Sequence, residues 1–399
     1  MRSETVPDTI SVDEVIAFTL RLVGESSLSA REAGVARLVA AEMTRLGFRV
    51  ETDRMGNVIG TVGREDGPCV LIDAHMDTVG VTDPSVWTRN TSGERAGERL
   101  YGRGTVDMKG PLAAAIHGVA SIKDRLPRGR VAVSATIAEE MIEGVATEAV
   151  ARRVAPDFAV IAEPSSSKLA RGQRGRAEMT VRTFGQPTHS SRPELGLNAA
   201  EAMTDVIVAL RSVPEPSHPV LGKGILVLTD LITRPYPALS VVPDLCVATY
   251  DRRTLPGETE EDALGPVREA MERGLARTGA RGSVEIAEDD FQSYTGVQIA
   301  APNFAPAWFY PEEAEIVVRS ERGLRQAGIE PELTVYAFCT NGSGTAGRLG
   351  IPTIGFGPGD ETLAHRTDEF IEIAELIDGA RGYAGIVQAL LAADPGGNA

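Results

Sequence analysis

A histidine and an aspartate stand two positions apart, just after a short apolar run. The run is Val70–Ile72, and the polar residues are His75 and Asp77. A neutral imidazole is a good ligand for zinc and similar ions, and a carboxylate two residues on can hold the other ring nitrogen. Alone, this pair indicates a possible metal ligand with a supporting acid.

Further acids stand where the chain leaves apolar segments or enters a helix. They are Asp107, Glu139, Glu140 and Glu163. The last three follow the apolar runs 131–137 and 158–161, and Asp107 precedes a helical stretch. Each acid alone could be a helix cap or a first-turn acid. Because open α/β sheets bind ligands beyond the carboxyl ends of their strands, the combined placement favours a site.

Glu139 and Glu140 are adjacent, so their side chains point in different directions. One can bind a metal ion while the other faces a bound water. A metal ion lowers the pKa of its water, and a nearby carboxylate can take that proton and return it to a leaving amine. Imidazole and carboxylate ligands without cysteine favour two divalent ions, such as Zn, Co or Mn, over a structural thiolate zinc.

The elements that position these residues follow an α/β pattern. Apolar runs alternate with helical stretches up to residue 164, which favours a largely parallel sheet. From about residue 172, alternating strand patterns surround two helical stretches, as in an α+β domain. The α/β pattern resumes near residue 303. We predict a discontinuous catalytic domain, 1–173 and 290–399, with an inserted α+β domain at 174–289.

Helix boundaries are predicted from capping patterns. Ser11 with Glu14, and Ser29 with Glu32, each match a capping box. A further helix is expected at 140–152, beginning at the second of the paired glutamates. The tail 394–399 is expected to be disordered.

Composition excludes several classes of protein. The 399 residues carry 56 acidic and 40 basic side chains, giving a net charge of −16, which disfavours binding to nucleic acid or an anionic membrane. The three cysteines are far apart and form no C-x-x-C, as expected in a reducing compartment. We see neither an apolar run near ~18 residues nor a signal-peptide core, so a cytoplasmic enzyme is expected.

Taken together, the motifs resemble those of the co-catalytic zinc amidohydrolases. They are H-M-D-T-V at 75–79, G-R-G-T-V-D-M-K-G at 102–110, A-E-E at 138–140, A-E-P at 162–164 and H-S-S-R-P-E-L-G-x-N-A at 189–199. This group contains acetylornithine deacetylase, succinyl-diaminopimelate desuccinylase, carboxypeptidase G and aminoacylase. The resemblance covers nearly the whole chain, and the stretch 340–359 looks most like the YgeY-type branch.

The resemblance implies the metal ligands residue by residue. Asp107 would bridge two divalent ions, with zinc expected and cobalt or manganese possible alternatives. His75 and Glu163 would complete the site of one ion. Glu140 and His365 would complete the site of the other.

The resemblance also implies catalytic roles and a dimer. Glu139 would be the general base, and Asp77 would orient His75. His189 lies in the inserted domain, which in relatives is a lid and dimerisation domain. There the matching histidine reaches the partner subunit's site and stabilises the tetrahedral oxyanion, so a homodimer is expected.

Substrate contacts are implied for three residues. Arg253, or Arg252 beside it, matches a family arginine that binds a substrate carboxylate, although a structural salt bridge explains either residue nearly as well. Asn341 stands where some relatives have an aspartate that recognises a substrate amine. Ser240–Pro243 departs from the N-x-x-P of many relatives. The expected substrate is a small amide with a carboxylate: an N-acyl or N-carbamoyl amino acid, or a dipeptide.

Two other functions compete with hydrolysis. Gly342–Gly347 matches G-x-G-x-x-G, which predicts a nucleotide-dependent oxidoreductase, but a tight turn beside the metal site explains these glycines equally well. The second alternative is a non-catalytic binding protein on the same fold. The presence of Glu139 beside the candidate ligands speaks against it, because binding alone needs no base.

Overall fold

The computed structural model describes residues 10–393, which form parts of two compact units. Unit 1 contains the chain up to Gln173, Asp290–Ile299 and the chain from Phe309 onward. Unit 2 contains Arg174–Asp289 and Ala300–Trp308. The predicted insertion did not include 300–308. This segment returns to unit 2 because β17 (Phe304–Ala305) pairs with β9 (Gly175–Phe184).

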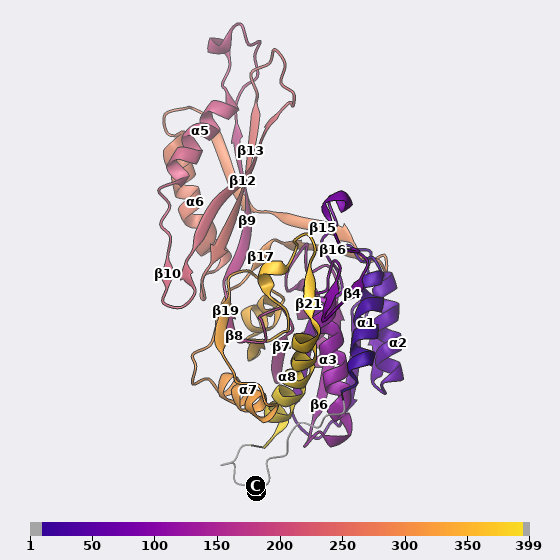
Figure 1. The fold of residues 1–399 in the computed structure, drawn as a ribbon. Helices are drawn as coiled ribbons and strands as arrows, with labels where there is room; N and C mark the ends of the chain where they lie inside the picture. The colour runs from indigo at the N-terminus through magenta and orange to yellow at the C-terminus, as the bar shows by residue number, and fades with distance from the viewer. Residues whose placement is uncertain (1–9, 394–399) are drawn as a thin grey trace. The chain divides into compact units, whose positions relative to one another are not determined.

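Unit 1 is built on a mixed, mostly parallel sheet (Figure 1). In the described residues the strand order is β1-β2-β6-β3-β7-β20-β8-β18, and β19 also pairs with β8. The strands are β1 (Arg49–Thr52), β2 (Val58–Gly63), β3 (Cys69–His75), β6 (Arg130–Thr136), β7 (Phe158–Ile161), β8 (Leu169–Gln173), β18 (Trp308–Phe309), β19 (Leu333–Tyr336) and β20 (Thr353–Gly355).

The centre of this sheet is parallel and buried. Ile72 of β3 lies opposite Val133 of β6 and Val160 of β7, and every residue of β3 is buried. Strands buried on both faces are expected to read as continuous apolar runs, which is the pattern of 69–72. The strand continues beyond the predicted end to His75. The fold class is therefore confirmed as α/β.

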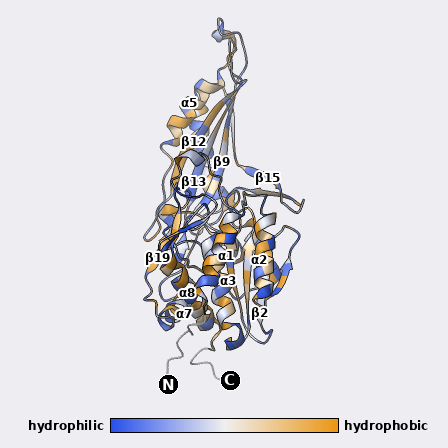
Figure 2. Ribbon diagram, turned by 45° about the vertical axis from the view of Figure 1, so that its right-hand side comes forward, coloured by the Kyte–Doolittle hydropathy of each residue, from blue (hydrophilic) through white to orange (hydrophobic). Residues whose placement is uncertain are grey.

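Helices and small strand pairs complete unit 1. The helices are α1 (Val12–Gly24), α2 (Ala33–Arg45), α3 (Lys109–Ile122), α4 (Val145–Val154), α7 (Glu315–Gln326) and α8 (Ile373–Leu391), and a small sheet joins β4 (Glu94–Ala96), β5 (Arg99–Tyr101) and β21 (Phe370–Glu372). Ser11 caps α1 as predicted. In Figure 2, α1 and α2 carry both hydrophobic and hydrophilic residues, as expected for helices that bury one face.

Two predicted helix starts are wrong. Glu32 precedes α2 but makes no side-chain capping bond, and Ser29 instead donates to Asp77. The helix predicted at 140–152 begins only at Val145. Side chains distant in sequence accept hydrogen bonds from the backbone before Val145, so that segment stays a loop.

Unit 2 is an α+β domain. Its strand order is β12-β13-β9-β14, with β17 also on β9. The other elements are β12 (Ile225–Arg234), β13 (Leu245–Thr254), β14 (Arg281–Ile286), α5 (Ala199–Leu210), α6 (Glu260–Leu275) and the short strands β10 (Ser217–His218) and β11 (Gly222–Lys223). Strands β9 and β13 alternate buried and half-buried residues, and their buried side chains form a core with α5 and α6. A further hairpin pairs β15 (Glu288–Gln292) with β16 (Gln298–Pro302).

No helix between residues 10 and 393 combines the length and apolarity that crossing a membrane requires. The expectations for the first nine residues and for 394–399 fall outside the described residues.

Candidate metal centre

Three neighbouring parallel strands bring candidate ligands to one edge of the unit 1 sheet. His75 ends β3, Glu139 and Glu140 follow β6, and Glu163 follows β7. Because the strands are adjacent and parallel, their carboxyl ends lie at the same edge. Asp107 joins them from the loop before α3.

Asp107 lies between the two candidate imidazole ligands. Its Oδ1 is 3.0 Å from Nε2 of His75, and its Oδ2 is 3.1 Å from Nε2 of His365. Glu140 Oε1 lies 3.1 Å from His365 Nε2, and Glu163 Oε1 lies 3.7 Å from His75 Nε2. The fold thus brings together all the predicted ligands, including His365, which is 225 positions from Glu140.

The His75 ring is oriented by Asp77, chiefly through the main chain. Nδ1 of His75 is 2.9 Å from the Asp77 carbonyl oxygen and 3.5 Å from the carboxylate Oδ1. Nε2 faces the Asp107 carboxylate at 3.0 Å, so once the Nε2 proton is lost, Nδ1–H would still donate to the carbonyl and the Nε2 lone pair would be available to a metal ion. This is the tautomer that a metal ligand requires.

The Asp77 carboxylate has a second task that the sequence did not reveal. It accepts hydrogen bonds from the backbone N–H groups of Glu139 and Glu140, both at 3.1 Å. The two preceding N–H groups, of residues 137 and 138, donate to Asn57 Oδ1 at 3.1 Å and Glu32 Oε1 at 3.0 Å. Four consecutive backbone donors are therefore held by side chains, which fixes the loop that carries the predicted base.

The burial and charge of these residues indicate whether they suit divalent ions. Five carboxylates, those of Asp77, Asp107, Glu139, Glu140 and Glu163, lie beside two imidazoles, and Glu139 and Glu163 are only 8% and 3% exposed. Burial raises the pKa of both glutamates well above the usual range. Burial opposes protonation of His75, but Asp107 and Asp77 raise its pKa. Buried carboxylates at such density need positive charge to ionise together, and divalent ions would supply it.

The donor set agrees with this conclusion. Two groups of three side chains each have ligand atoms within 4.8 Å of one another: His75, Asp107 and Glu140, and His75, Glu139 and Glu163. Imidazole nitrogen and carboxylate oxygen are common ligands of zinc and related ions. The donor types therefore suit divalent ions, but neither group coincides with a ligand set that the resemblance implies, because the first combines His75 with Glu140 and the second includes the predicted base Glu139.

The remaining predicted residues of unit 2 differ in accessibility. His189 is exposed, and its Nδ1 accepts from the Ser191 backbone N–H at 3.1 Å, so Nε2 carries the proton in the neutral ring. The Arg252 side chain is only 2% exposed, and its Nη2 is 2.7 Å from Glu258 Oε1. The Arg253 side chain is 27% exposed and forms an ion pair with Asp251. Of the two arginines, Arg253 is the more accessible to a ligand.

Asn341 lies in the core, where its contacts differ from the predicted contact with a substrate amine. It is 2% exposed, and its Nδ2 donates to Asp73 Oδ2 at 2.9 Å and to Thr136 Oγ1 at 3.1 Å. Its Oδ1 accepts from Gly144 N at 2.8 Å. The amide is thus engaged at both ends by protein groups, and this geometry does not support contact with a substrate amine.

The glycine-rich stretch 342–347 also has a packing role. Residues 342–346 are buried and open a short π-helix, Ser343–Arg348. A Cβ atom on Gly344 would lie 2.2 Å from the carbonyl oxygen of Gly144. Close backbone packing therefore explains the glycine, and the nucleotide-dependent alternative is not favoured.

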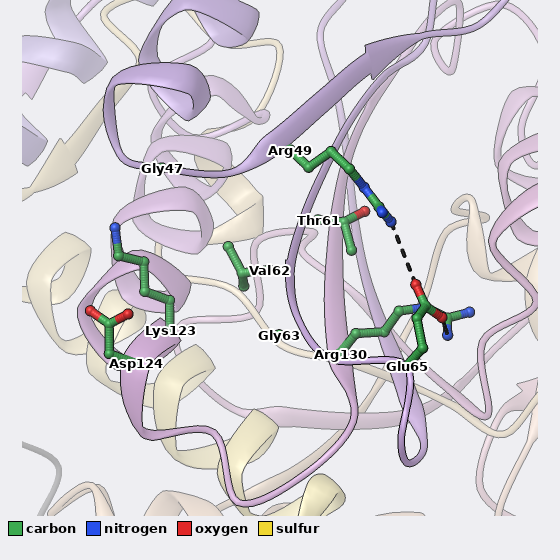
Figure 3. A pocket seen from close by; sticks show the side chains of 9 residues that line it. All are labelled: Gly47, Arg49, Thr61, Val62, Gly63, Glu65, Lys123, Asp124 and Arg130. Carbon is green, nitrogen blue, oxygen red and sulfur yellow. Dashed lines mark hydrogen bonds and ion pairs between the residues drawn. The ribbon is translucent and has the colours of Figure 1, made fainter.

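A separate hollow of about 400 Å³ lies at the other end of β6 (Figure 3). Arg49, Arg130 and Lys123 are its basic residues. Arg49 lies 3.5 Å from Glu65, Arg130 also donates to the Val154 carbonyl, and Lys123 donates to the Leu46 carbonyl. None of the candidate ligands lines this hollow.

Comparisons with known proteins agree with the motifs. A family model described as peptidase family M20/M25/M40 matches residues 71–389. The uncharacterized protein YgeY of Escherichia coli strain K12 is 33% identical over 393 residues, covering 96% of this chain and 95% of its own length. Acetylornithine deacetylase of Proteus mirabilis is 28% identical over 392 residues, covering 92% of this chain and 94% of its own.

The fold has close counterparts among solved structures. One is the YXEP protein of Bacillus subtilis, described as a dinuclear metal-binding peptidase from the M20 family. It superposes with a TM-score of 0.69 at 13% identity, covering 95% of this chain and 98% of its own. The resemblance inferred from the motifs is confirmed, and a metal-dependent hydrolase is indicated. The chain belongs to peptidase family M20/M25/M40.

Proposed function

We propose that this protein hydrolyses the amide bond of an N-acyl or N-carbamoyl amino acid, or of a dipeptide, with two divalent ions and Glu139 as the general base. The observation that carries the proposal is the placement of Asp107 between two imidazoles, with a third carboxylate, Glu140, 3.1 Å from His365. Bound at these residues, divalent ions would lower the pKa of a water and polarise an amide carbonyl.

The protein's own groups would manage the proton. Glu139 is buried beside His75, with its Oε2 3.9 Å from the imidazole Nε2. Its carboxylate would accept a proton from the attacking water and return it to the leaving amine. Because the hydrogen bonds from residues 137–140 fix its backbone, the base would need little reorganisation during the reaction.

The residues of unit 2 enter this proposal through the family resemblance. His189, with Nε2–H as a donor, would stabilise the oxyanion, and Arg253 would bind the substrate carboxylate. A carboxylate-bearing substrate is in keeping with the deacetylase relative. The similarity to an acetylornithine deacetylase supports an amide as the substrate.

We also propose a homodimer formed through unit 2. Strand β12 is at the edge of its sheet and exposes Val227 and Leu231, which are 47% and 49% exposed. An exposed edge strand with apolar side chains is a surface suited to pairing with another chain. Replacing Leu231 with Lys should shift the protein toward monomer, as measured by light scattering after gel filtration. An unchanged mass for the variant would count against this surface.

The proposal is tested by a substrate screen on metal-loaded protein. N-acetyl, N-succinyl and N-carbamoyl amino acids and dipeptides are incubated with wild type and with Glu139→Gln, and the released amine is measured. Hydrolysis by wild type and its loss in the variant are expected. Equal release by both proteins would refute the mechanism. Metal binding with no hydrolysis of any amide would favour the non-catalytic binding protein instead.

A further inference from the structure

One buried carboxylate outside the ligand set holds the loop that carries Asp107. Glu369 is fully buried. Its Oε1 accepts hydrogen bonds from three backbone N–H groups, those of Gly104 at 3.0 Å, Val106 at 2.8 Å and Asp107 at 3.2 Å. The last of these donors belongs to the residue that lies between the two imidazoles.

The rest of Glu369 binds the same loop. Its second oxygen, Oε2, accepts from Arg103 Nη1 at 2.5 Å, and its backbone carbonyl accepts from Gly102 N at 2.9 Å. Arg103 is itself 9% exposed, with its guanidinium over the ring of Trp87 at 5.4 Å. One residue therefore contacts the backbone or side chain of most of the segment 102–107.

Glu369 also stands on the segment that delivers His365. It follows His365 by four positions and immediately precedes β21. Strand β21 pairs with β5, so that Phe370 lies opposite Tyr101, and the loop 102–107 begins directly after Tyr101. The loop 102–107 and the segment 365–369 therefore adjoin the same end of this strand pair, and the Glu369 side chain binds one to the other there.

We propose that Glu369 is a positioning residue, which sets the separation of Asp107 and His365 and thereby the affinity of their shared site for divalent ions. The inference rests on the proposed function, because it assumes that these residues bind metal. Hydrogen bonds to a carboxylate are stronger than those between neutral groups, so a side chain that accepts three backbone N–H bonds holds this loop firmly. Residues that support metal ligands commonly change metal affinity by about 10–100-fold when replaced.

The test compares metal binding in two variants of this residue and a neighbouring control. In Glu369→Gln the remaining oxygen can still accept from the backbone, but the new amide N–H₂ faces the Arg103 guanidinium, also a donor. Glu369→Ala removes every side-chain contact. The matched control is Asp368→Asn, because Asp368 holds a different loop, through Thr88 and Arg89.

The readout is titration of the metal-free proteins with Zn²⁺ by calorimetry, together with the absorption spectrum of bound Co²⁺. We expect about 10–100-fold weaker binding in Glu369→Gln and a larger loss in Glu369→Ala. The control should match wild type. An altered cobalt spectrum in Glu369→Gln would support a change in ligand geometry, which a role in folding alone does not predict.

The outcomes separate this inference from the proposed function. If wild type and Glu369→Gln bind Zn²⁺ equally well with the same cobalt spectrum, the positioning role is overturned while the metal site stands. If wild type itself binds no divalent ion, the proposed function fails and the inference fails with it. If Glu369→Gln does not fold, Glu369→Asp serves in its place, because it keeps the charge but shortens the side chain that reaches the backbone N–H groups of the Asp107 loop. Wild-type affinity in that folded variant would also overturn the role.

Discussion

Replacing Glu139 with Gln should remove catalysis while leaving the metal ligands in place. Glutamine has nearly the same shape as glutamate but cannot accept a proton at neutral pH. The backbone N–H of residue 139 would still donate to Asp77 Oδ1, at 3.1 Å in the wild-type structure. The loop should therefore keep its conformation, and only the side-chain chemistry changes.

The size of the effect follows from the role of the group. A positioned general base contributes about 10²–10⁴-fold to rate, which corresponds to about 3–5 kcal/mol of activation free energy. We expect a loss in the upper half of that range, because the base is fixed on a loop whose four donors are all occupied. The loss should fall on kcat more than on KM.

The variant should also be more stable without metal. Burial raises the folded-state pKa of Glu139 well above 4.5, so ionising this side chain costs stability in the metal-free protein. The sign follows from linkage: an acid with a raised pKa binds its proton more tightly when folded, and stability falls as pH rises above the unfolded value. The gain from Glu139→Gln should thus be absent in acid and grow toward alkaline pH.

Three measurements decide the prediction. Metal analysis after dialysis should give the same metal content for wild type and Glu139→Gln, whereas Glu140→Gln, which removes a proposed carboxylate ligand, should lose metal. Steady-state kinetics should show the drop in kcat. Denaturation of the metal-free proteins should show the pH-dependent gain. Retention of more than about a tenth of wild-type kcat would refute the role of Glu139 as base, since even the weakest expected effect is larger.

Three further predictions follow from the same structure. Asn341→Ala should lower the free energy of unfolding by about 2–4 kcal/mol in urea titrations, because Gly144 N–H and Asp73 each lose a buried partner. The KM of the variant should equal that of wild type, and a raised KM with normal stability would restore the substrate role of Asn341. Burial raises the pKa of Glu32 to about 7. Between pH 4.5 and 7 the free energy of unfolding of wild type should therefore fall by about 3 kcal/mol more than that of Glu32→Gln, and parallel pH profiles of this free energy would contradict the prediction. Chelation should abolish hydrolysis and lower the melting temperature, and both should recover on adding Zn²⁺, Co²⁺ or Mn²⁺. The melting temperature should change because a ligand at about 1,000 times its Kd stabilises the folded protein by about 4 kcal/mol. Activity that survives full metal removal would refute metal dependence.

The sequence by itself determined the fold class and indicated which residues to expect at the candidate metal centre. Apolar runs such as 69–72 can be recognised locally, because a strand buried on both faces has no polar alternation. The acids and the histidine that follow such runs can also be recognised in the sequence alone. Parallel strands bring these residues to one edge of the sheet, so the sequence alone predicts that they lie close together.

Only the tertiary structure decided which residues support that centre. Ser29 and Glu32 match a capping box, yet Ser29 donates to Asp77 and Glu32 accepts from Ala138 N, 106 positions away. Asn341 matches a substrate position, yet its amide is saturated by groups up to 268 positions away. Glu369 carries no local signal for holding a loop that lies 262–265 positions earlier in the chain. A short polar side chain bonds whatever donor the fold brings within about 3 Å, and spacing along the chain does not record that partner.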